Sequence, residues 1–421
     1  MDDFSKINSM DDFYKEIGKN LPTIEIHAIE NFGPSLLNRG EDGRAKTIVF
    51  GGTQRVRVSS QCIKYAMRTD EKTRDTWRTR CAGDLVATKL HERFPEATDE
   101  YLGKIAIAVN NCITPKGDKN ADKAKEKKDH MVTICMNDVN AFIDLIIAVF
   151  PINCEIADND LVVDVDKNAI KSKTKTTEIL KGMMATAASR PVSTEMAIYG
   201  TISTSLAMRS IDSSVSLNHM LSTNEASLDV DFFTAVDEWA TLKKLGTSEA
   251  VGAGMMQETD IKSACFYRYG AINTLSVAEN LLVGIDFSDK EELRKRLEMM
   301  KDAVSDFIAG FILAVPKAKQ ASMASHPVPS AVYITAGVRP QPYSRENAFL
   351  RCAYAHDNED VVSDSVKKLV DYIDNDPFNM NAYDKELWIA RDEYDSPKTC
   401  VRRTLAETLN ELEEYIDEKL Y

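Results

Sequence analysis

The chain has 421 residues, of which 43% are hydrophobic and 28% are charged, and its formal net charge is −14. This acidic balance argues against non-specific binding of polyanions, and no apolar run approaches the roughly 20 residues that span a membrane. The length suggests two or three domains with substantial cores.

The start of the chain and its cysteines indicate a cytoplasmic protein. The N-terminus is acidic and lacks the basic and then apolar pattern of a signal peptide. The eight cysteines are scattered, and no two of them form a CxxC pair. We therefore expect reduced thiols, and neither a disulfide framework nor a zinc site.

The charge is unevenly distributed along the chain. Residues 38–80 contain eleven Lys/Arg and five Asp/Glu, whereas residues 356–421 contain eight Lys/Arg and eighteen Asp/Glu. Because a partner responds to the local field, the first region can attract an anion although the whole chain is acidic.

The first predicted strand is Thr23–Glu30, which alternates apolar and polar residues. A loop rich in glycine and charge follows, and then a second predicted strand with the sequence Arg55-Val56-Arg57-Val58. Alternate residues of a strand face opposite sides, so the two arginines share one face and the two valines share the other.

A helix is predicted from Gln61 to Arg68, with Ile63 and Met67 facing inward. A serine directly before such a helix is a good N-cap, and the helix start offers free backbone N–H groups that suit a phosphate. Lys64 and Arg68 are one turn apart and share a face.

Together these elements predict a cationic strip beside a cluster of N–H groups, which suits a nucleic-acid backbone. Its cations are Arg39, Lys46, Arg55, Arg57, Lys64 and Arg68. The alternative interpretation is purely structural, because a half-exposed strand before a capped helix uses the same residue types.

Residues 69–181 are predicted to be a mostly helical insertion with three helix-period segments. Between them, residues 115–130 carry six lysines and no large apolar residue, which fits either a basic finger over nucleic acid or a solvated linker. A short strand is predicted at 161–168, and a basic helix start at 171–184.

Strand chemistry returns at Glu195–Ile202 and at Ala264–Tyr269, and again at Ser330–Val338 after a long amphipathic helix at Lys290–Leu313. The intervening residues 203–258 are polar and rich in small residues, which predicts a protruding hairpin outside the main core.

Without its insertions the chain reads β, α, β, then β, α, β, which predicts an α+β protein with a ferredoxin-like (RRM-like) palm. The predicted palm is discontinuous and covers residues 20–68, 182–202 and 259–340. Residues 341–421 are predicted to be an acidic and mainly helical C-terminal region.

Five blocks of the chain resemble the CasC family, the backbone subunit of type I-E CRISPR Cascade. They occur in the family's order and span about Ile24 to Val338. The blocks are FGPSLLNRGEDGRAKTIVFGGTQRVRVSSQCIKYAMR, MAIYG (196–200), DFFTAVDEW (231–239), GAGM…SACFYRY (252–269) and AVPKAKQASMASHPVPSAV (314–332).

The resemblance implies a non-catalytic subunit that polymerises along CRISPR guide RNA together with other Cascade subunits. The palm would hold the guide backbone, and Ser59, Ser60 and Gln61 would donate hydrogen bonds to it. The helical insertion would form fingers, and residues 203–258 would form a thumb that reaches the next copy. The target DNA strand would pair with the guide, and no membrane is involved.

The resemblance implies two further RNA-facing positions. In similar proteins the block that matches MAIYG continues Gly-Arg-Met, and its apolar side chain wedges beside a displaced base. Thr201-Ile202 replaces Arg-Met here, which keeps an apolar wedge at Ile202 but loses a cation. The second position is the loop with Lys319, Gln320, Ser322 and His326. Gln54 and Tyr65 stand where relatives often carry basic residues.

No catalytic or cofactor motif is recognisable, so no catalytic residue, metal ligand or cofactor is assigned. Asp229, Asp231, Asp237 and Glu238 are acids in a turn and helix-start context, where acids are expected. Two other functions share the expected architecture. One is an RNA-guided endoribonuclease that cuts with a loop aspartate, and the other is a generic binder of single-stranded RNA.

Overall fold

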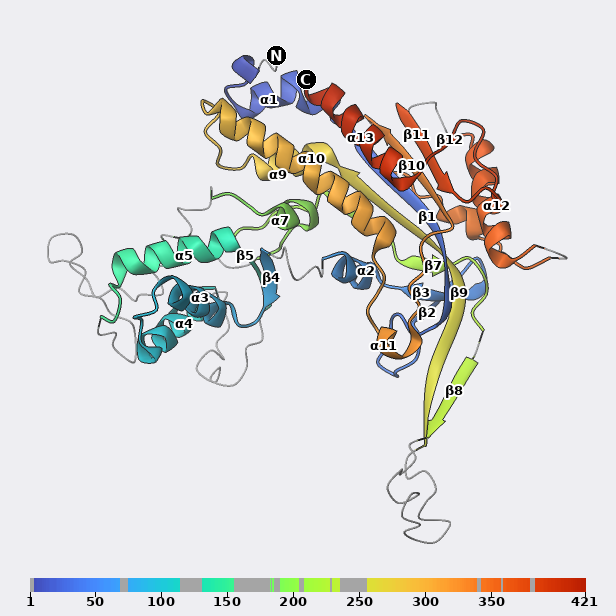
Figure 1. The fold of residues 1–421 in the computed structure, drawn as a ribbon, viewed down its shortest axis with the longest axis horizontal. Coiled ribbons are helices and arrows are strands. Elements are labelled where there is room, and N and C mark those ends of the chain that lie inside the picture. Colours follow the sequence, from blue (N-terminus) through green and yellow to red (C-terminus); the bar gives the residue numbers. More distant parts are fainter. Residues whose placement is uncertain are drawn as a thin grey trace, which may run out of the picture.

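A computed structural model describes most of the chain as an α+β protein built on one large mixed sheet (Figure 1). The α+β class predicted from the sequence is therefore confirmed. The described residues are 4–68, 75–113, 131–154, 182, 184, 190–203, 208–227, 229–234, 256–338, 342–356, 359–378 and 383–421.

The sheet has the strand order β12-β11-β10-β1-β9-β7-β3-β2, and β6 and β8 also pair with β9. Strands β11 and β12 are parallel and the other pairs are antiparallel. The strands are β1 Thr23–Ser35, β2 Thr47–Phe50, β3 Thr53–Val58, β6 Val215–Leu217, β7 Met220–Ser222, β8 Asp229–Thr234, β9 Met256–Asn273, β10 Ala331–Gly337, β11 Lys385–Ala390 and β12 Val401–Arg402.

Helices cover both faces of this sheet: α9, α10 and α13 pack on one face and α12 packs on the other (Figure 1). The long helix matches its prediction, and Asp289 caps it by accepting from the backbone N–H groups of Glu291 and Glu292. The helices around the sheet are α1 Met10–Glu16, α2 Ser60–Met67, α7 Thr194–Tyr199, α9 Thr274–Leu281, α10 Lys290–Leu313, α11 Gln320–Met323, α12 Val361–Asp374 and α13 Leu405–Leu420.

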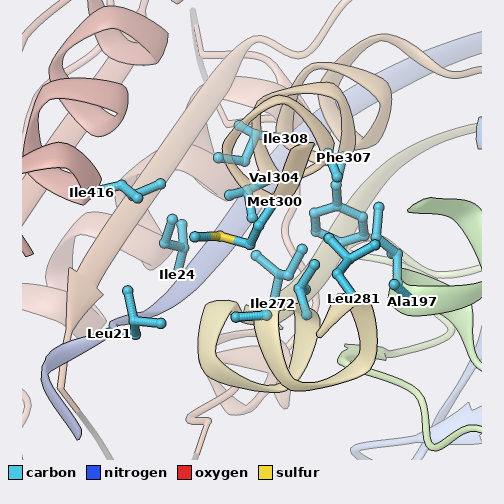
Figure 2. Close-up of a cluster of buried hydrophobic side chains, with 14 of the residues drawn as sticks. Leu21, Ile24, Ala197, Ile272, Leu281, Met300, Val304, Phe307, Ile308 and Ile416 are labelled. Atoms are coloured by element: carbon cyan, nitrogen blue, oxygen red, sulfur yellow. The ribbon is translucent and has the colours of Figure 1, made fainter. Parts of the chain in front are cut away.

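Strand β1 is buried on both faces because each face has its own helical layer. Ile24 and Ile26 belong to the larger core, where Ile24 meets Met300 and Val304 of α10 (Figure 2). Ile29 belongs instead to the core under α12. A strand between two layers must bury nearly every side chain, which explains why Thr23–Glu30 is buried throughout.

The face of the sheet under α12 buries polar groups that form a hydrogen-bonded network. The hydroxyl of Tyr269 donates to Glu25 over 3.0 Å, and the hydroxyl of Tyr267 lies 2.8 Å from Nδ1 of His27. On the other side of His27, Nε2 lies 2.9 Å from Nη1 of the fully buried Arg345. Since buried polar groups are costly when unpaired, this network fixes the C-terminal region on the sheet.

Within the predicted insertion, the described residues form a helical unit with its own core (Figure 1). Its elements are β4 Thr76–Thr79, α3 Ala82–Arg93, α4 Asp99–Ile113, β5 Val132–Cys135 and α5 Met136–Val149. The predictions for residues 115–130 and 161–168, and most of the prediction for 171–184, lie outside the described residues.

The predicted strand at Glu195–Ile202 is wrong, because these residues form helix α7 and its exit. Ser193 caps the helix by accepting from the N–H of Met196, and Gly200 ends it with φ of 67°. Only glycine adopts this φ easily, so the capping signals at both ends favour a helix over the weak alternation.

Two other segments differ from their predictions. Residues 203–258 were expected outside the core, but β6 and β7 pair with β9 in the main sheet and bury Val215 and Met220. Residues 341–421 were expected to be mainly helical, yet β11 pairs with β10 and extends the sheet. In both cases the strands are stabilised by partners distant in sequence.

Candidate nucleic-acid interface

Helix α2 begins as the sequence predicts. Ser59 is its N-cap: its hydroxyl accepts from the N–H of Cys62 over 3.3 Å, and its own N–H donates to the Asn38 side chain over 3.1 Å. Ile63 is fully buried in a small cluster with the valines of β3, which fixes the helix start against the strand.

Basic side chains and His219 converge on this helix start. Nη1 of Arg57 lies 3.3 Å from Nδ1 of His219, and the N–H of Ser60 donates to the same nitrogen over 3.2 Å. Lys46 lies alongside, because its backbone carbonyl accepts from the N–H of Arg57 over 2.8 Å. We call Lys46, Arg57, Ser60 and His219 the α2-start site.

The contacts of His219 determine its tautomer and its charge. A backbone N–H can only donate, so Nδ1 accepts and the ring proton of the neutral imidazole lies on Nε2. Burial, and then the charges of Arg57 and Lys46, lower the pKa of His219. The imidazole is therefore neutral at pH 7 and its Nε2–H is a donor.

His219 was missed by the sequence analysis as part of this site. It lies between β6 and β7, about 160 residues from α2 along the chain. No local pattern around His219 signals this contact, because the pairing of β7 with β3 is what places it beside Arg57.

A second basic group lies farther along α2. Burial, and then the charges of Arg78 and Arg68, lower the pKa of Lys64, which places the three cations close together. Arg78 lies in β4 and was also not predicted as a site residue. It is exposed, and burial and then the charge of Arg68 lower its pKa.

Arg68 was predicted to contact phosphate, but its charge is already paired. Its guanidinium forms an ion pair with Glu195 and lies 5.6 Å above the ring of Tyr199. The side chain is only 12% exposed. Arg68 therefore joins α2 to α7, and among the described residues Lys64 and Arg78 are the neighbouring cations without an ion pair to Glu195.

The prediction that Arg55 contacts a backbone phosphate is wrong. Arg55 is fully buried, and its guanidinium donates to the carbonyls of Ser222, Thr223 and Phe349 over 2.7 to 2.9 Å. It joins β3 to β7 and to the C-terminal region, so its role is structural.

Most of the remaining predicted residues near α2 are at least partly accessible. Arg39 and Gln61 are exposed, Lys46 and Lys64 are half-buried, and Ser59 is buried as the cap. The structure thus brings most of the predicted strip together, but divides it into the α2-start site and the group around Lys64.

Ile202 is 91% exposed, the most exposed of the large apolar side chains in the described residues. It follows Thr201, whose N–H donates to the carbonyl of Ile211 over 2.9 Å and whose carbonyl accepts the reciprocal bond over 2.8 Å. This pair of hydrogen bonds fixes the backbone beside Ile202, whose apolar side chain projects into solvent.

The loop after α10 holds the other predicted residues. Lys319 and His326 are exposed, whereas Gln320 and Ser322 use their side chains for local bonds to the carbonyls of Pro316 and Lys319, each over 3.1 Å. Gln320 and Ser322 thus shape the loop, and Lys319 and His326 are exposed charged or titratable groups on it. Val315 packs on the cluster under α2, which links this loop to the α2-start site.

The described residues contain neither a candidate metal site nor a candidate membrane-spanning helix. They contain no group of three or more His, Cys, Asp or Glu side chains that could hold a metal ion. Among these residues, too, no helix is long and apolar enough to cross a membrane.

The layered sheet and the basic helix start define an α+β protein with a surface suited to a phosphate backbone. The same fold occurs in a chain of a solved structure described as "CRISPR RNA-guided surveillance complex, pre-nicking", with a TM-score of 0.64 and 19% identity over 94% of this chain and 100% of that chain. A second structure, "CRISPR RNA-guided surveillance complex", gives a TM-score of 0.48 and 17% identity over 93% of this chain and 99% of that chain.

The chain belongs to the CRISPR-associated (Cas) family described as CT1975-like protein, whose family model matches residues 24–418. The match includes nearly all of the acidic C-terminal region, which lies beyond the five blocks noted in the sequence. No curated protein matches the chain.

Proposed function

We propose that this chain is the RNA-binding backbone subunit of a type I-E Cascade surveillance complex, a non-catalytic protein of the CasC type. Membership of the CT1975-like Cas family supports the proposal, as does the fold similarity to a chain of a CRISPR RNA-guided surveillance complex. In this proposal β1, β9, β10 and α10 form the ferredoxin-like palm, and the helical unit of α3, α4 and α5 forms the fingers.

The observation that carries the proposal is the α2-start site. Lys46 and Arg57 supply positive charge, and His219 presents an Nε2–H donor beside the first turn of α2. Cations and donors at a helix start are the groups that bind phosphate in proteins. Phosphate contacts position a nucleic acid without reading its sequence, as a subunit of an RNA-guided complex requires.

The face of the sheet under α12 is covered, which supports binding of the guide through its phosphates and not through stacked bases. RRM proteins stack bases on exposed sheet aromatics, but Tyr267, Tyr269 and Tyr333 are buried under the C-terminal region. The bases of the guide therefore remain free to pair with a target strand, and Ile202 is the wedge that displaces a base at each repeat.

Assembly along the guide is assigned to the ribbon of β8 and the start of β9. This ribbon projects from one end of the sheet (Figure 1). Phe232 on the ribbon is 62% exposed, so a neighbouring copy that covers it would bury apolar surface.

The first experiment is to purify the protein from its native host and sequence the nucleic acid that copurifies. A discrete CRISPR guide is the expected result. Heterogeneous RNA would favour a generic RNA-binding protein, and metal-dependent cleavage of a matched RNA would favour an endoribonuclease.

The second experiment measures the affinity for single-stranded RNA as a function of salt. The double variant Arg57→Ala/Lys64→Ala should lower the slope of log K against log salt by about 1.4, since each lost phosphate contact contributes about 0.7. Lys367→Ala is the matched control, because Lys367 is an exposed lysine on α12, on the other side of the sheet. Equal slopes for the double variant and the control would contradict the proposed interface.

A further inference from the structure

A buried ion pair lies beneath the loop that follows α10. Glu30 of β1 and Arg268 of β9 are each about 1% exposed, and Nη2 of Arg268 lies 3.1 Å from Oε2 of Glu30. The guanidinium also lies 5.0 Å from the centre of the Phe311 ring. Neither carboxylate oxygen of Glu30 has a hydrogen-bond partner, so this ion pair is the contact that offsets the burial of its charge.

The same guanidinium caps the end of α10. Nη1 donates to the carbonyl of Ala314 and Nη2 to the carbonyl of Ile312, each over 3.0 Å. The carbonyl of Ile312 would ordinarily accept from the N–H four residues later, but that residue is Pro316, which has no N–H. Arg268 supplies the donor that the helix lacks.

The other end of this loop is fixed to the adjoining part of β1. The N–H of Ser330 donates to the carbonyl of Ile29 over 2.8 Å. Between the two ends, Lys319 and Ala324 have φ of 56° and 48°, a left-handed conformation that is costly for residues other than glycine. Such a loop keeps its shape only where its ends are held firmly.

We propose that Arg268 is a positioning residue for nucleic-acid binding, with Glu30 as its counter-charge. Arg268 is buried and does not touch RNA. It fixes the exit of α10, and through it the loop 314–330, so that Lys319 reaches the backbone beside the α2-start site. The expected effect on RNA binding rests on the proposed function, but the positioning of the loop can be measured without RNA.

A double-mutant cycle on the salt slope of RNA binding tests the inference. Arg268→Met and Lys319→Ala should each lower the slope by about 0.7, and together they should lower it no further, because both remove the same contact. Arg268→Met with Arg57→Ala should lower it by about 1.4, since Arg57 binds elsewhere. Arg345→Met is the control for loss of a buried arginine and should leave the slope unchanged.

Arg268→Lys provides a second variant in case Arg268→Met does not fold. It keeps the positive charge beside Glu30, but one ammonium group cannot replace the forked pair of bonds to two carbonyls. We expect faster amide hydrogen exchange at Ser322 and Ala324, whose N–H groups donate to carbonyls within the loop.

The outcomes separate the two proposals. Additive losses of slope for Arg268→Met and Lys319→Ala, or unchanged exchange in Arg268→Lys, would overturn the positioning role. If the unaltered protein binds no RNA while exchange in the loop responds to Arg268→Lys, the proposed function fails and the positioning of the loop by Arg268 stands.

Discussion

Arg55 and Arg57 are two residues apart in β3, and we predict that methionine at the first position lowers stability whereas methionine at the second weakens RNA binding. Arg55→Met removes the buried donor of three carbonyls, those of Ser222, Thr223 and Phe349. Arg57→Met removes a half-buried cation beside His219 and leaves the core intact.

The structure gives the magnitudes. A buried carbonyl that loses a charged donor costs about 1–3 kcal/mol, and because the three bonds share one side chain we expect a total loss of about 3–5 kcal/mol for Arg55→Met. Arg57→Met should change the free energy of unfolding by less than about 0.5 kcal/mol, as surface substitutions do, while lowering the salt slope of RNA binding by about 0.7.

The assay is urea unfolding followed by tryptophan fluorescence. Trp388 is fully buried in the same core as Phe349, so its emission reports the part of the sheet that Arg55 supports. Arg55→Met should lower the urea midpoint, and Arg57→Met should not. Equal stability of the two variants, or a lost phosphate contact in folded Arg55→Met, would refute the structural role of Arg55.

Three further predictions follow from other regions. Burial raises the pKa of Glu30 from 4.5 to about 7, so the folded protein favours the protonated carboxyl. The contribution of this group to folding stability is therefore fully present below pH 4.5 and is lost as the pH rises through 7. Glu30→Gln should therefore remove about 3 kcal/mol of pH dependence from the free energy of unfolding in that range, and an unchanged profile would contradict this. The purified protein should not cleave matched RNA with magnesium or manganese, and cleavage abolished by a single Asp→Ala substitution would refute the non-enzyme proposal. Replacing residues 229–258 by a short Gly-Ser linker should preserve the sheet and binding to a short oligonucleotide but abolish ordered assembly on a full-length guide; normal multimers in native mass spectrometry would show that the ribbon does not assemble the copies.

The parts of the fold that the sequence predicts well have strong local signals. The strand at Thr23–Glu30 and the helix at Lys290–Leu313 have clear apolar patterns, and the cap at Ser59 uses a serine before a helix-period segment. The resemblance to a Cas backbone subunit likewise depended on short blocks of sequence, and membership of the CT1975-like family agrees with its broad class.

The errors arise where distant residues decide the outcome. Alternation predicts two equivalent arginines in β3, but Phe349, almost 300 residues later, covers Arg55 and leaves Arg57 accessible. Arg68 is neutralised by Glu195, and His219 reaches α2 only because β7 pairs with β3. Periodicity within one segment cannot reveal any of these contacts.

The pairing of β1 has a consequence for synthesis of the chain on the ribosome. Thr23 pairs with Asn273 in β9 and with Gly337 in β10, so the first long strand of the sheet is made long before its partners. At synthesis rates of about 5–20 residues per second, β1 waits roughly 15–60 s for β10. During that time Ile24 and Ile26 have no sheet to join, whereas α3, α4 and α5 can already pack on one another. We therefore expect the nascent chain to need a chaperone on its N-terminal strand until almost the whole protein has been translated.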